Sequence, residues 1–377
     1  MRIAIFTETF VPAVNGIVTR LGHTVSRLTA RGDQVMLVVP DGGVREFRQA
    51  QVVSVPVIPL PMYPDVGIAL PHPDVWRKVE AFSPDVIHAV NPVVLGASGI
   101  QIARSNGIPL VASYHTHLPR YLGHYAMGFL ESIAWDWLRT LHNQAAINLC
   151  TSSPIADELM AKGFERVRVA WRGGVDLNLF NPSRMSREMR MRLGGDTDDA
   201  ILLYVGRLSA EKGLERLRAC LEANPGVRLA MVGDGPHRPA LERHFAGTRV
   251  RFLGRLQGES LAAAYASADV FVFPSETDTF GLVLLEALAS GCPVVAARAG
   301  GVSDIVRDGQ DGILFDPSDI HALPEAAARL ARPSAQRQLM RWSGRMRAEG
   351  WSWDSAVDDL RANYREAILK RHGKLAA

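Results

Sequence analysis

The sequence is poor in cysteine and has no long hydrophobic run, and each shortage excludes a class of protein. Three cysteines occur in 377 residues, at Cys150, Cys220 and Cys292, and none is part of a Cys-x-x-Cys pair. Cysteines so far apart predict neither a zinc site nor a disulfide framework, and they suit a reducing cytosol. No apolar run approaches the ~20 residues that span a bilayer, and the N-terminus lacks the long apolar region of a signal peptide. We therefore expect a cytoplasmic protein, with contact to a membrane surface left open.

An excess of charge of either sign is also missing. Lys and Arg together number 42 and Asp and Glu 39, which leaves a net charge of +3. A dedicated nucleic-acid binder carries a strongly basic stripe, so this balance predicts no nucleic-acid partner. The composition, with 47% hydrophobic and 21% charged residues, is typical of soluble globular proteins. At roughly 150 residues per domain, the length predicts two or three domains.

Short apolar runs rich in β-branched residues alternate with amphipathic stretches along the whole chain. The runs that we expect to form strands include Ile3–Phe6, Val52–Ile58 and Leu110–Ser113 in the first half. The rhythm restarts after Pro182 with runs such as Ile201–Val205. Near-continuous apolar strands separated by helices predict parallel sheets that are covered on both faces. Two such series predict two doubly wound, Rossmann-like α/β domains.

The break between the two series lies in the segment FNPSRMSREM, where Asn, Pro and Ser interrupt the pattern. We therefore expect a first domain over residues 1–182 and a second over residues 183–352. The tail predicts one long helix over residues 353–377, which we expect to pack back on the first domain. In open α/β sheets, ligands bind beyond the carboxyl ends of the strands, so the loops that follow strands are the places to look for functional residues.

Two strand-end loops of the first half carry candidate residues. Asn15 and Gly16 allow a tight turn before a predicted helix, whose N-terminus can hold an anionic group, although an ordinary turn explains them equally well. No Gly-x-Gly-x-x-Gly follows the first strand, which argues against an NAD site. His115 and His117 follow the strand Leu110–Ser113, and histidine can polarise or donate to a reacting group near neutral pH. No third metal ligand follows, so we expect no metal, and the strand-end position favours a functional role for His115.

The second half places cations and glycines in loops of the same kind. Arg207 and Lys212 bracket a predicted junction between a strand and a helix, an arrangement that suits the clamping of a diphosphate. Gly233 follows the next strand, and its small size permits close approach by a ligand. A plain turn explains Gly233 equally well.

The loop and helix after Phe273 carry two carboxylates, Asp278 and Glu286. Glu286 lies within the apolar helical sequence LVLLEALA, where an unpartnered carboxylate costs several kcal/mol. We therefore expect it to accept hydrogen bonds from a specific partner, and sugar hydroxyls are suitable donors. The backbone N–H groups around Phe280–Val283 form a second cradle for a phosphate or sugar oxygen.

These residues resemble a known family. Asp278 and Glu286 match the E-x7-E motif of the retaining glycosyltransferases of family 4, which have the GT-B fold of two Rossmann-like domains facing each other across a cleft. VGRLSAEKG, VGDGP, YASADVFVFPS and GLVLLEALASGCPVVAARAGG also match that family, and the resemblance covers essentially the whole chain. TETFVPAVNGIVTRL, ASYHTHLPRYL and ARAGGVSDIV are similar to the sulfolipid synthases within it, which move sulfoquinovose from its UDP donor to diacylglycerol.

The resemblance implies a role for each matched position. Arg207 and Lys212 bind the donor diphosphate and stabilise the departing UDP, while Glu286 holds the ribose hydroxyls. Asp278 faces the transferred sugar, and His115 lies over that sugar near the reacting carbon. The implied catalytic residues are His115, Arg207, Lys212 and Asp278. The implied donor-binding residues are Gly16, Arg207, Lys212, Gly233, Arg255, Leu256, Asp278, Thr279, Phe280, Gly281, Leu282 and Glu286.

The sequence departs from the family at Asp278, where Glu is usual, and at Gly173, where relatives commonly have Arg or Asn. The resemblance also implies retention of the anomeric configuration, no metal requirement and no cofactor, since the UDP-sugar is a substrate. Arg20, Arg120 and Lys212 are the candidates for contact with the sulfonate. The alternative interpretations are a glucosyl- or mannosyltransferase that makes another glycolipid, and a non-catalytic sugar-nucleotide-binding protein.

A diacylglycerol acceptor implies peripheral docking on the cytoplasmic face of a plasma or photosynthetic membrane. Segments 60–73 and 121–137 of the first domain mix Tyr, Met, Trp and Leu with small and polar residues, which suits a lipid interface. We expect Ile133 and Trp137 to face the core instead. The expected acceptor-binding residues are Met62, Tyr63, Tyr121 and Tyr125.

Overall fold

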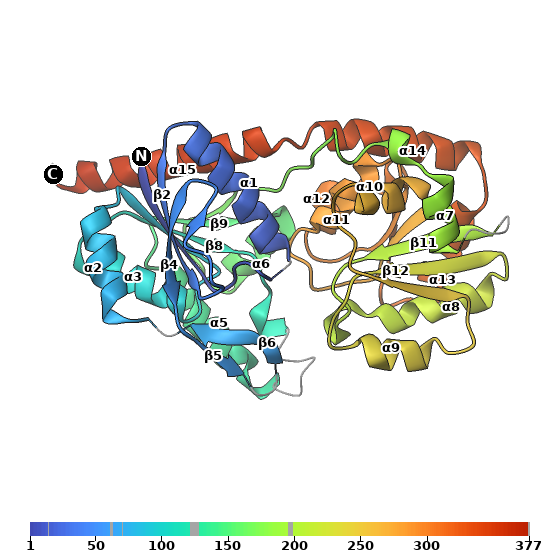
Figure 1. Cartoon of the computed structure of the whole chain (residues 1–377), viewed down its shortest axis with the longest axis horizontal. Coiled ribbons are helices and arrows are strands. Elements are labelled where there is room, and N and C mark those ends of the chain that lie inside the picture. Colours follow the sequence, from blue (N-terminus) through green and yellow to red (C-terminus); the bar gives the residue numbers. More distant parts are fainter. Residues whose placement is uncertain (14, 61–62, 70, 121–127, 195–198, 376–377) are drawn as a thin grey trace. The chain divides into compact units, whose positions relative to one another are not determined.

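The computed structural model in Figure 1 describes residues 1–13, 15–60, 63–69, 71–120, 128–194 and 199–375. The chain divides into two compact units, one made of Met1–Gly173 with Trp353–Ala377 and the other of Gly174–Ser352. Val175 and Phe180 pack in the core of the second unit. The chain therefore enters that unit before residue 182, where we expected the boundary.

The first unit is built on an eight-stranded sheet of order β10-β9-β8-β7-β1-β2-β4-β3. Its neighbouring strands are parallel except for β3 and β4, and β5 and β6 form a separate antiparallel pair. The expected strand Val52–Ile58 is divided, because Pro56 has no N–H group to donate and lies between β4 and β5. The strands are β1 (Arg2–Thr7), β2 (Gln34–Pro40), β3 (Glu46–Phe47), β4 (Ala50–Val55), β5 (Val57–Leu60), β6 (Tyr63–Ala69), β7 (Val86–Val90), β8 (Leu110–Tyr114), β9 (Ile147–Cys150) and β10 (Val167–Val169).

Helices cover both faces of this sheet (Figure 1). They are α1 (Gly16–Ala30), α2 (Pro73–Phe82), α3 (Leu95–Ser105), α5 (Glu131–His142), α6 (Ser153–Ala161) and α15 (Trp353–Leu375), with a short 3-10 helix η1 (Gly128–Leu130) before α5. Successive residues of a strand point to opposite faces. Ile3 and Ile5 of β1 accordingly pack in one core cluster with residues of α1 and α15, and Ala4 and Phe6 pack in another with residues of α2 and α3. Burial on both faces explains why the strands are almost entirely apolar.

The C-terminal helix α15 packs on α1 within the first unit. Arg31, at the end of α1, donates hydrogen bonds of 2.9 Å to Asp354 and to Asp358. Arg361 donates a hydrogen bond of 2.7 Å to the buried carboxylate of Asp33. Apolar side chains on the inner face of α15 complete the core on that side of the sheet.

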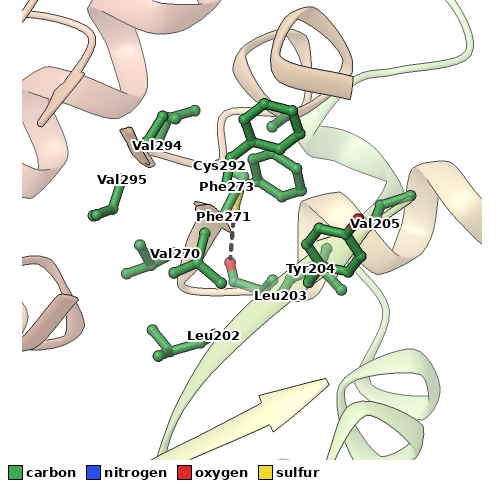
Figure 2. Packing of buried hydrophobic residues seen from close by; sticks show 14 of the residues in the cluster. Leu202, Leu203, Tyr204, Val205, Val270, Phe271, Phe273, Cys292, Val294 and Val295 are labelled. Atoms are coloured by element: carbon green, nitrogen blue, oxygen red, sulfur yellow. Dashed lines mark hydrogen bonds between the residues drawn. The ribbon is translucent and has the colours of Figure 1, made fainter. Parts of the chain in front are cut away.

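The second unit is built on a six-stranded, fully parallel sheet of order β13-β12-β11-β14-β15-β16. Figure 2 shows part of its core, where Leu203, Phe271 and Val294 come from three strands. Cys292 lies in the same core, and all three cysteines are buried without a disulfide in the described part of the chain. The strands are β11 (Ala200–Val205), β12 (Val227–Val232), β13 (Val250–Gly254), β14 (Val270–Phe273), β15 (Val294–Ala297) and β16 (Gly312–Phe315). The helices are α7 (Arg187–Leu193), α8 (Leu217–Ala223), α9 (Arg238–His244), α10 (Gly258–Ser267), α11 (Leu282–Ala289), α12 (Val302–Ile305), α13 (Ala322–Ala331) and α14 (Ala335–Glu349).

Candidate functional site

Two strand-end loops of the second unit bring Lys212 and Asp278 into contact. β11 and β14 are neighbouring parallel strands, so the loops that follow them lie at the same edge of the sheet. Lys212 ends a 3-10 turn, η3 (Ala210–Lys212). The helix that we expected directly after it begins only at Leu217. Nζ of Lys212 donates to both carboxylate oxygens of Asp278 at 2.8 Å, and both side chains are largely buried. The family resemblance implied one site for both residues, but the local sequence carried no sign of this ion pair.

One further hydrogen bond joins the two loops beside this pair, and another orders the loop after β11. Thr277 Oγ1 donates to the backbone carbonyl of Glu211 at 3.4 Å. Ser209 Oγ donates to the Glu211 carboxylate at 2.5 Å, and all three side chains are buried. Bonds within the protein therefore hold these loops, so Lys212 and Asp278 are positioned before any ligand binds.

A third loop, after β15, supports the backbone at Asp278. The N–H of Gly301 donates to the carbonyl of Asp278 at 3.1 Å. A Cβ atom at Gly300 would overlap the same carbonyl oxygen, and one at Gly301 would overlap the carbonyl oxygen of Thr279. Only glycine allows this approach, so the Gly-Gly pair is a structural part of the site that sequence analysis did not single out.

The loops after β11, β12 and β13 also touch one another. A Cβ atom at Gly233 would overlap the carbonyl oxygen of Gly206, and the N–H of Gly233 donates to the carbonyl of Gly254 at 2.8 Å. The small size of Gly233 suggested that a ligand could approach it. In the structure, this small size is needed for the contact between the loops. Of the two donor-binding residues that the resemblance implies after β13, Arg255 is exposed and Leu256 packs half-buried against the core.

Glu286 has the specific partner that its apolar helix predicted. It lies on α11, and Tyr265 of α10 donates its hydroxyl to Oε2 of Glu286 at 2.9 Å. Burial raises the pKa of Glu286 to about 7, although the hydrogen bond from Tyr265 acts in the opposite direction. Tyr265 was missed by sequence analysis, because nothing in its local pattern distinguishes it from an ordinary core residue. Within the described residues its hydroxyl is the one donor to this carboxylate, which leaves Oε1 for a ligand.

The other positions assigned to donor binding in this unit differ in which of their atoms are accessible. Arg207 is exposed directly after β11. Phe280 is buried, with its ring centroid 5.4 Å from that of Trp351, so only its backbone can face a ligand. Gly281 precedes α11 with a φ of 95°, a conformation that favours glycine. Leu282 is the first residue of that helix, as predicted.

In the first unit, His115 directly follows β8, and both of its ring nitrogens have partners. They lie 3.0 Å from Nη1 of Arg20 and 2.9 Å from Oγ of Ser113. The imidazole packs edge-on against the indole of Trp171, with centroids 4.9 Å apart. Sequence analysis selected His115 but not these partners, because Arg20 and Trp171 are distant from it along the chain.

Two helix N-termini of the first unit are capped by side chains of the chain itself. Oδ1 of Asn15 accepts hydrogen bonds of 3.0 Å from the N–H groups of residues 17 and 18 in the first turn of α1, which we had considered for an anionic group. Glu8 follows β1 at the point where the strand order reverses between β1 and β7, the usual ligand position of such sheets. Its carboxylate accepts four backbone N–H groups of residues 93–96 at 2.8 to 3.1 Å. Gly16 begins α1 next to the cap, and sequence analysis overlooked Glu8.

His117 serves the fold rather than a metal. It is buried, and its Nε2 lies 2.9 Å from Oε2 of Glu158 on α6. Arg120 donates to the other oxygen of the same carboxylate at 2.9 Å. This arrangement also engages Arg120, which was a candidate for the sulfonate.

The expectation that Ile133 and Trp137 face the core is wrong. Ile133 is 62% exposed and Trp137 is 47% exposed, and Phe129, four residues earlier in the chain than Ile133, is 76% exposed. The core-facing side of α5 is formed instead by Trp135 and Leu138, which lie on the opposite face of the helix from Ile133 and Trp137. We call Phe129, Ile133 and Trp137 the α5 stripe.

Met62, Tyr121 and Tyr125 lie outside the described residues, as does the side chain of Tyr63, whose backbone is part of β6. Across the described ranges of the chain, no helix is both long enough and apolar enough to cross a membrane.

Comparisons with known proteins match both units. Residues 14–179 match the family described as Glycosyltransferase Family 4, and residues 199–332 match the family described as Glycosyl transferases group 1. The chain is 38% identical to the sulfoquinovosyl transferase SQD2 of Arabidopsis thaliana, over 98% of this chain and 74% of that protein. It is 36% identical to a GDP-mannose-dependent alpha-mannosyltransferase of Mycobacterium tuberculosis, over 100% of this chain and 99% of that protein.

A solved structure supports the fold. Sucrose-phosphate synthase from Thermosynechococcus elongatus matches with a TM-score of 0.80 over 98% of this chain and 99% of that chain, at 22% identity. This likeness confirms the predicted GT-B fold with two Rossmann-like parallel sheets.

The raised pKa of Glu286 predicts a specific dependence of stability on pH. Between about pH 4.5 and 7 the native carboxyl holds a proton that the unfolded carboxyl has lost, so stability falls as pH rises through this window and levels off above it. Urea unfolding at pH 5, 6, 7 and 8 should show wild type losing on the order of 1 kcal/mol relative to Glu286→Gln across the window. Glu325→Gln, at an exposed position of α13, is the control. A constant difference between wild type and Glu286→Gln contradicts the prediction.

Proposed function

The chain belongs to glycosyltransferase family 4, and we propose that it transfers sulfoquinovose from UDP-sulfoquinovose to diacylglycerol with retention of configuration. The observation that carries this choice of donor and acceptor is the likeness to the Arabidopsis sulfoquinovosyl transferase over nearly the whole chain. The Lys212–Asp278 pair and the half-buried Glu286 supply residues that suit a nucleotide-sugar donor.

The leaving group of this reaction is UDP, and its developing negative charge needs cations. Lys212 is held at the strand-end edge by Asp278, and Arg207 is exposed at the start of the same loop. Positive charge that the fold already holds in position stabilises a departing diphosphate, because the protein does not have to rearrange during the reaction. We assign this role to both cations, and the reaction then needs no metal or cofactor.

Glu286 is assigned to the ribose of the donor. Tyr265 occupies Oε2, and Oε1 can accept hydrogen bonds from two ribose hydroxyls. Hydroxyl donors favour the ionised carboxylate, so binding of the nucleotide near pH 7 releases a proton from this residue. The backbone of residues 279–282, with the adjacent Gly233, Arg255 and Leu256 loops, completes the proposed donor site.

Asp278 orients Lys212 and faces the transferred sugar rather than acting as a base. Both of its oxygens accept hydrogen bonds from the ammonium group of Lys212. The hydroxyl oxygen of diacylglycerol forms the new bond to the anomeric carbon on the face from which the phosphate oxygen leaves. Its proton passes to that departing oxygen. Because the new bond forms on the face that the phosphate leaves, the configuration is retained.

A glycosyltransferase with another donor is the second candidate. The mannosyltransferase of Mycobacterium tuberculosis matches the full length of this chain, and its printed donor is GDP-mannose. A non-catalytic sugar-nucleotide-binding protein is less well supported, because it has no use for a cation pair, a buried carboxylate and His115 together.

The transfer reaction tests the proposal directly. Purified chain is incubated with dioleoylglycerol vesicles and UDP-sulfoquinovose, UDP-glucose or GDP-mannose, and the product lipid is analysed by mass and by proton NMR of the anomeric coupling. We expect sulfoquinovosyldiacylglycerol with the anomeric configuration of the donor. A mannosyl or glucosyl product formed at a higher rate overturns the donor assignment, and an inverted anomer overturns the mechanism.

The Lys212–Asp278 pair predicts coupled losses of activity. Lys212→Ala or Arg207→Ala should lower kcat about 10²-fold or more in the presence of EDTA, as loss of preorganised charge stabilisation does. Asp278→Asn should lower kcat because it leaves a largely buried ammonium without its anion, and Asp278→Glu should keep most activity. The double variant Lys212→Ala/Asp278→Asn should be no worse than Lys212→Ala alone.

A matched control lies beside this pair. Glu276 forms an exposed ion pair of 2.8 Å with Arg216, and Glu276→Gln should leave kcat near the wild-type value. Additive losses in the double variant, or a normal rate for Asp278→Asn, argue against the assignment, as does a strict metal requirement.

The acceptor reaches the enzyme from a bilayer, and we assign docking to the first unit. The α5 stripe exposes two aromatic side chains and one aliphatic one, a mixture that suits a lipid interface. The proposed acceptor residues Tyr121 and Tyr125 precede it in the chain, and Met62 and Tyr63 belong to the other apolar segment of this unit.

Replacement of the stripe should weaken membrane binding. A triple variant in which Ser replaces Phe129, Ile133 and Trp137 should show several-fold less flotation with neutral and anionic vesicles. Moderate salt should have little effect on the flotation of wild type. Trp342→Ser removes a tryptophan that is 66% exposed on α14 of the second unit and is the control. Equal loss in the control, or unchanged flotation and transfer in the triple variant, places the docking surface elsewhere.

A further inference from the structure

The partners of the His115 ring determine where its proton lies. A guanidinium group has donors only and no lone pair to accept a hydrogen bond. Because Nη1 of Arg20 lies 3.0 Å from Nδ1 of His115, that nitrogen must be the acceptor and carries no proton. A neutral imidazole then has its proton on Nε2, which donates to Oγ of Ser113 at 2.9 Å.

Arg20 is itself held firmly in place. It lies on α1 and is buried, with 4% of its surface exposed. The same Nη1 donates to the carbonyl oxygen of Trp171 at 3.1 Å, and the guanidinium lies over the indole ring at 5.5 Å. Burial lowers the pKa of Arg20 to about 9, so the group remains charged at neutral pH. Its charge and direction are therefore properties of the folded first unit.

Three titratable groups surround the imidazole, and the one that is charged near pH 7, Arg20, disfavours its protonation. They are Arg20 from α1, His88 from β7 and His142 from α5. Burial, and next to it the charge of Arg20, hold the pKa of His115 well below its ordinary value. Burial likewise lowers the pKa of His88 to about 3, so that this neighbour is neutral too.

Ser113 fixes the other side of the ring and is itself anchored. Its hydroxyl lies 2.8 Å from Nε2 of His88, and Nδ1 of His88 lies 2.7 Å from the hydroxyl of Tyr364 on α15. A chain of polar groups thus runs from α1 through β8 and β7 to α15. A sugar hydroxyl can replace Ser113 Oγ as the acceptor of the Nε2 proton, whereas no sugar group can supply the charge of Arg20.

We propose that Arg20 is a positioning residue that holds His115 as the neutral Nε2–H tautomer, so that His115 serves the reaction as a hydrogen-bond donor and not as an acid or a base. The part that concerns the reaction rests on the proposed function and on the place over the donor sugar that the family resemblance implies for His115. This use of Arg20 replaces the sulfonate contact that the sequence suggested for it.

The tautomer is measurable without any activity. Full-length chain labelled with 15N-histidine is examined by long-range 1H–15N correlation between pH 5 and 8, and His115 is assigned by its absence in His115→Gln. We expect a single Nε2–H tautomer that does not titrate in this range. An Nδ1–H tautomer, or titration of His115 near its ordinary pKa, overturns the inference.

Variants separate the charge of Arg20 from the rest of the chain of contacts. Arg20→Met should raise the pKa of His115 by about one to three units, since a neighbouring cation shifts a pKa by that amount. Arg20→Lys, which keeps the charge, should restore the wild-type behaviour. Tyr364→Phe removes the hydrogen bond between Tyr364 and His88, and it should leave the His115 tautomer unchanged.

Kinetics then distinguish the inference from the proposed function. If His115 is used as proposed, the profile of kcat against pH for Arg20→Met gains an acid limb at the pH where NMR shows His115 titrating, and wild type lacks this limb. A shifted pKa in Arg20→Met without any change in the rate profile supports the positioning role of Arg20 and overturns the place of His115 in the reaction. An unshifted pKa in a folded Arg20→Met overturns the positioning role itself.

Discussion

The candidate donor site depends on one interaction, the ion pair between Lys212 and Asp278. An ammonium group that is largely buried is stable only with an anion beside it, and Asp278 supplies that anion from a different strand-end loop. The pair therefore fixes the loop after β11 relative to the loop after β14. A hydrogen bond from Thr277 to the Glu211 carbonyl joins the same two loops, and the glycines at 300 and 301 of the loop after β15 support the backbone at Asp278. The cation that the reaction needs is thus ordered by the fold and not by the ligand.

The two units differ in what their strand-end edges offer to a ligand. In the second unit, Lys212 and Arg207 lie in loops at that edge, which suits a diphosphate. In the first unit, side chains of the protein occupy two helix N-termini, with Asn15 on α1 and Glu8 on α3. The anion-binding capacity of those helix ends is used internally, an arrangement that suits an uncharged acceptor such as diacylglycerol.

Much of the fold follows from the sequence because burial on both faces leaves a distinctive pattern. Runs such as Ile3–Phe6 and Ile201–Val205 became strands, and the loops after them carry the candidate residues because parallel strands end at one edge. The partners could not be read in the same way. Tyr265 meets Glu286, and Arg20 meets His115, only through the packing of elements that are far apart in the chain.

The errors have equally local causes. Trp137 was assigned to the core because it lies in a segment rich in apolar residues. In the structure, the face of α5 that packs on the core carries Trp135 and Leu138, and Trp137 is exposed. Pro56 ended a strand that the apolar pattern continued, because proline cannot donate to the ladder. The boundary near residue 182 was late, because Val175 and Phe180 already belong to the second core.

Nucleotide titration tests the central claim most directly, since the claim is that the second unit holds a uridine diphosphate between Lys212 and Glu286. Calorimetric titration of full-length chain with UDP and with GDP, without sugar or lipid, measures this site alone. We expect UDP to bind at least about tenfold more tightly than GDP, a difference of about 1.4 kcal/mol, and Lys212→Ala to weaken UDP binding by a similar factor. Tighter binding of GDP, or UDP affinity unchanged in Lys212→Ala, contradicts the account.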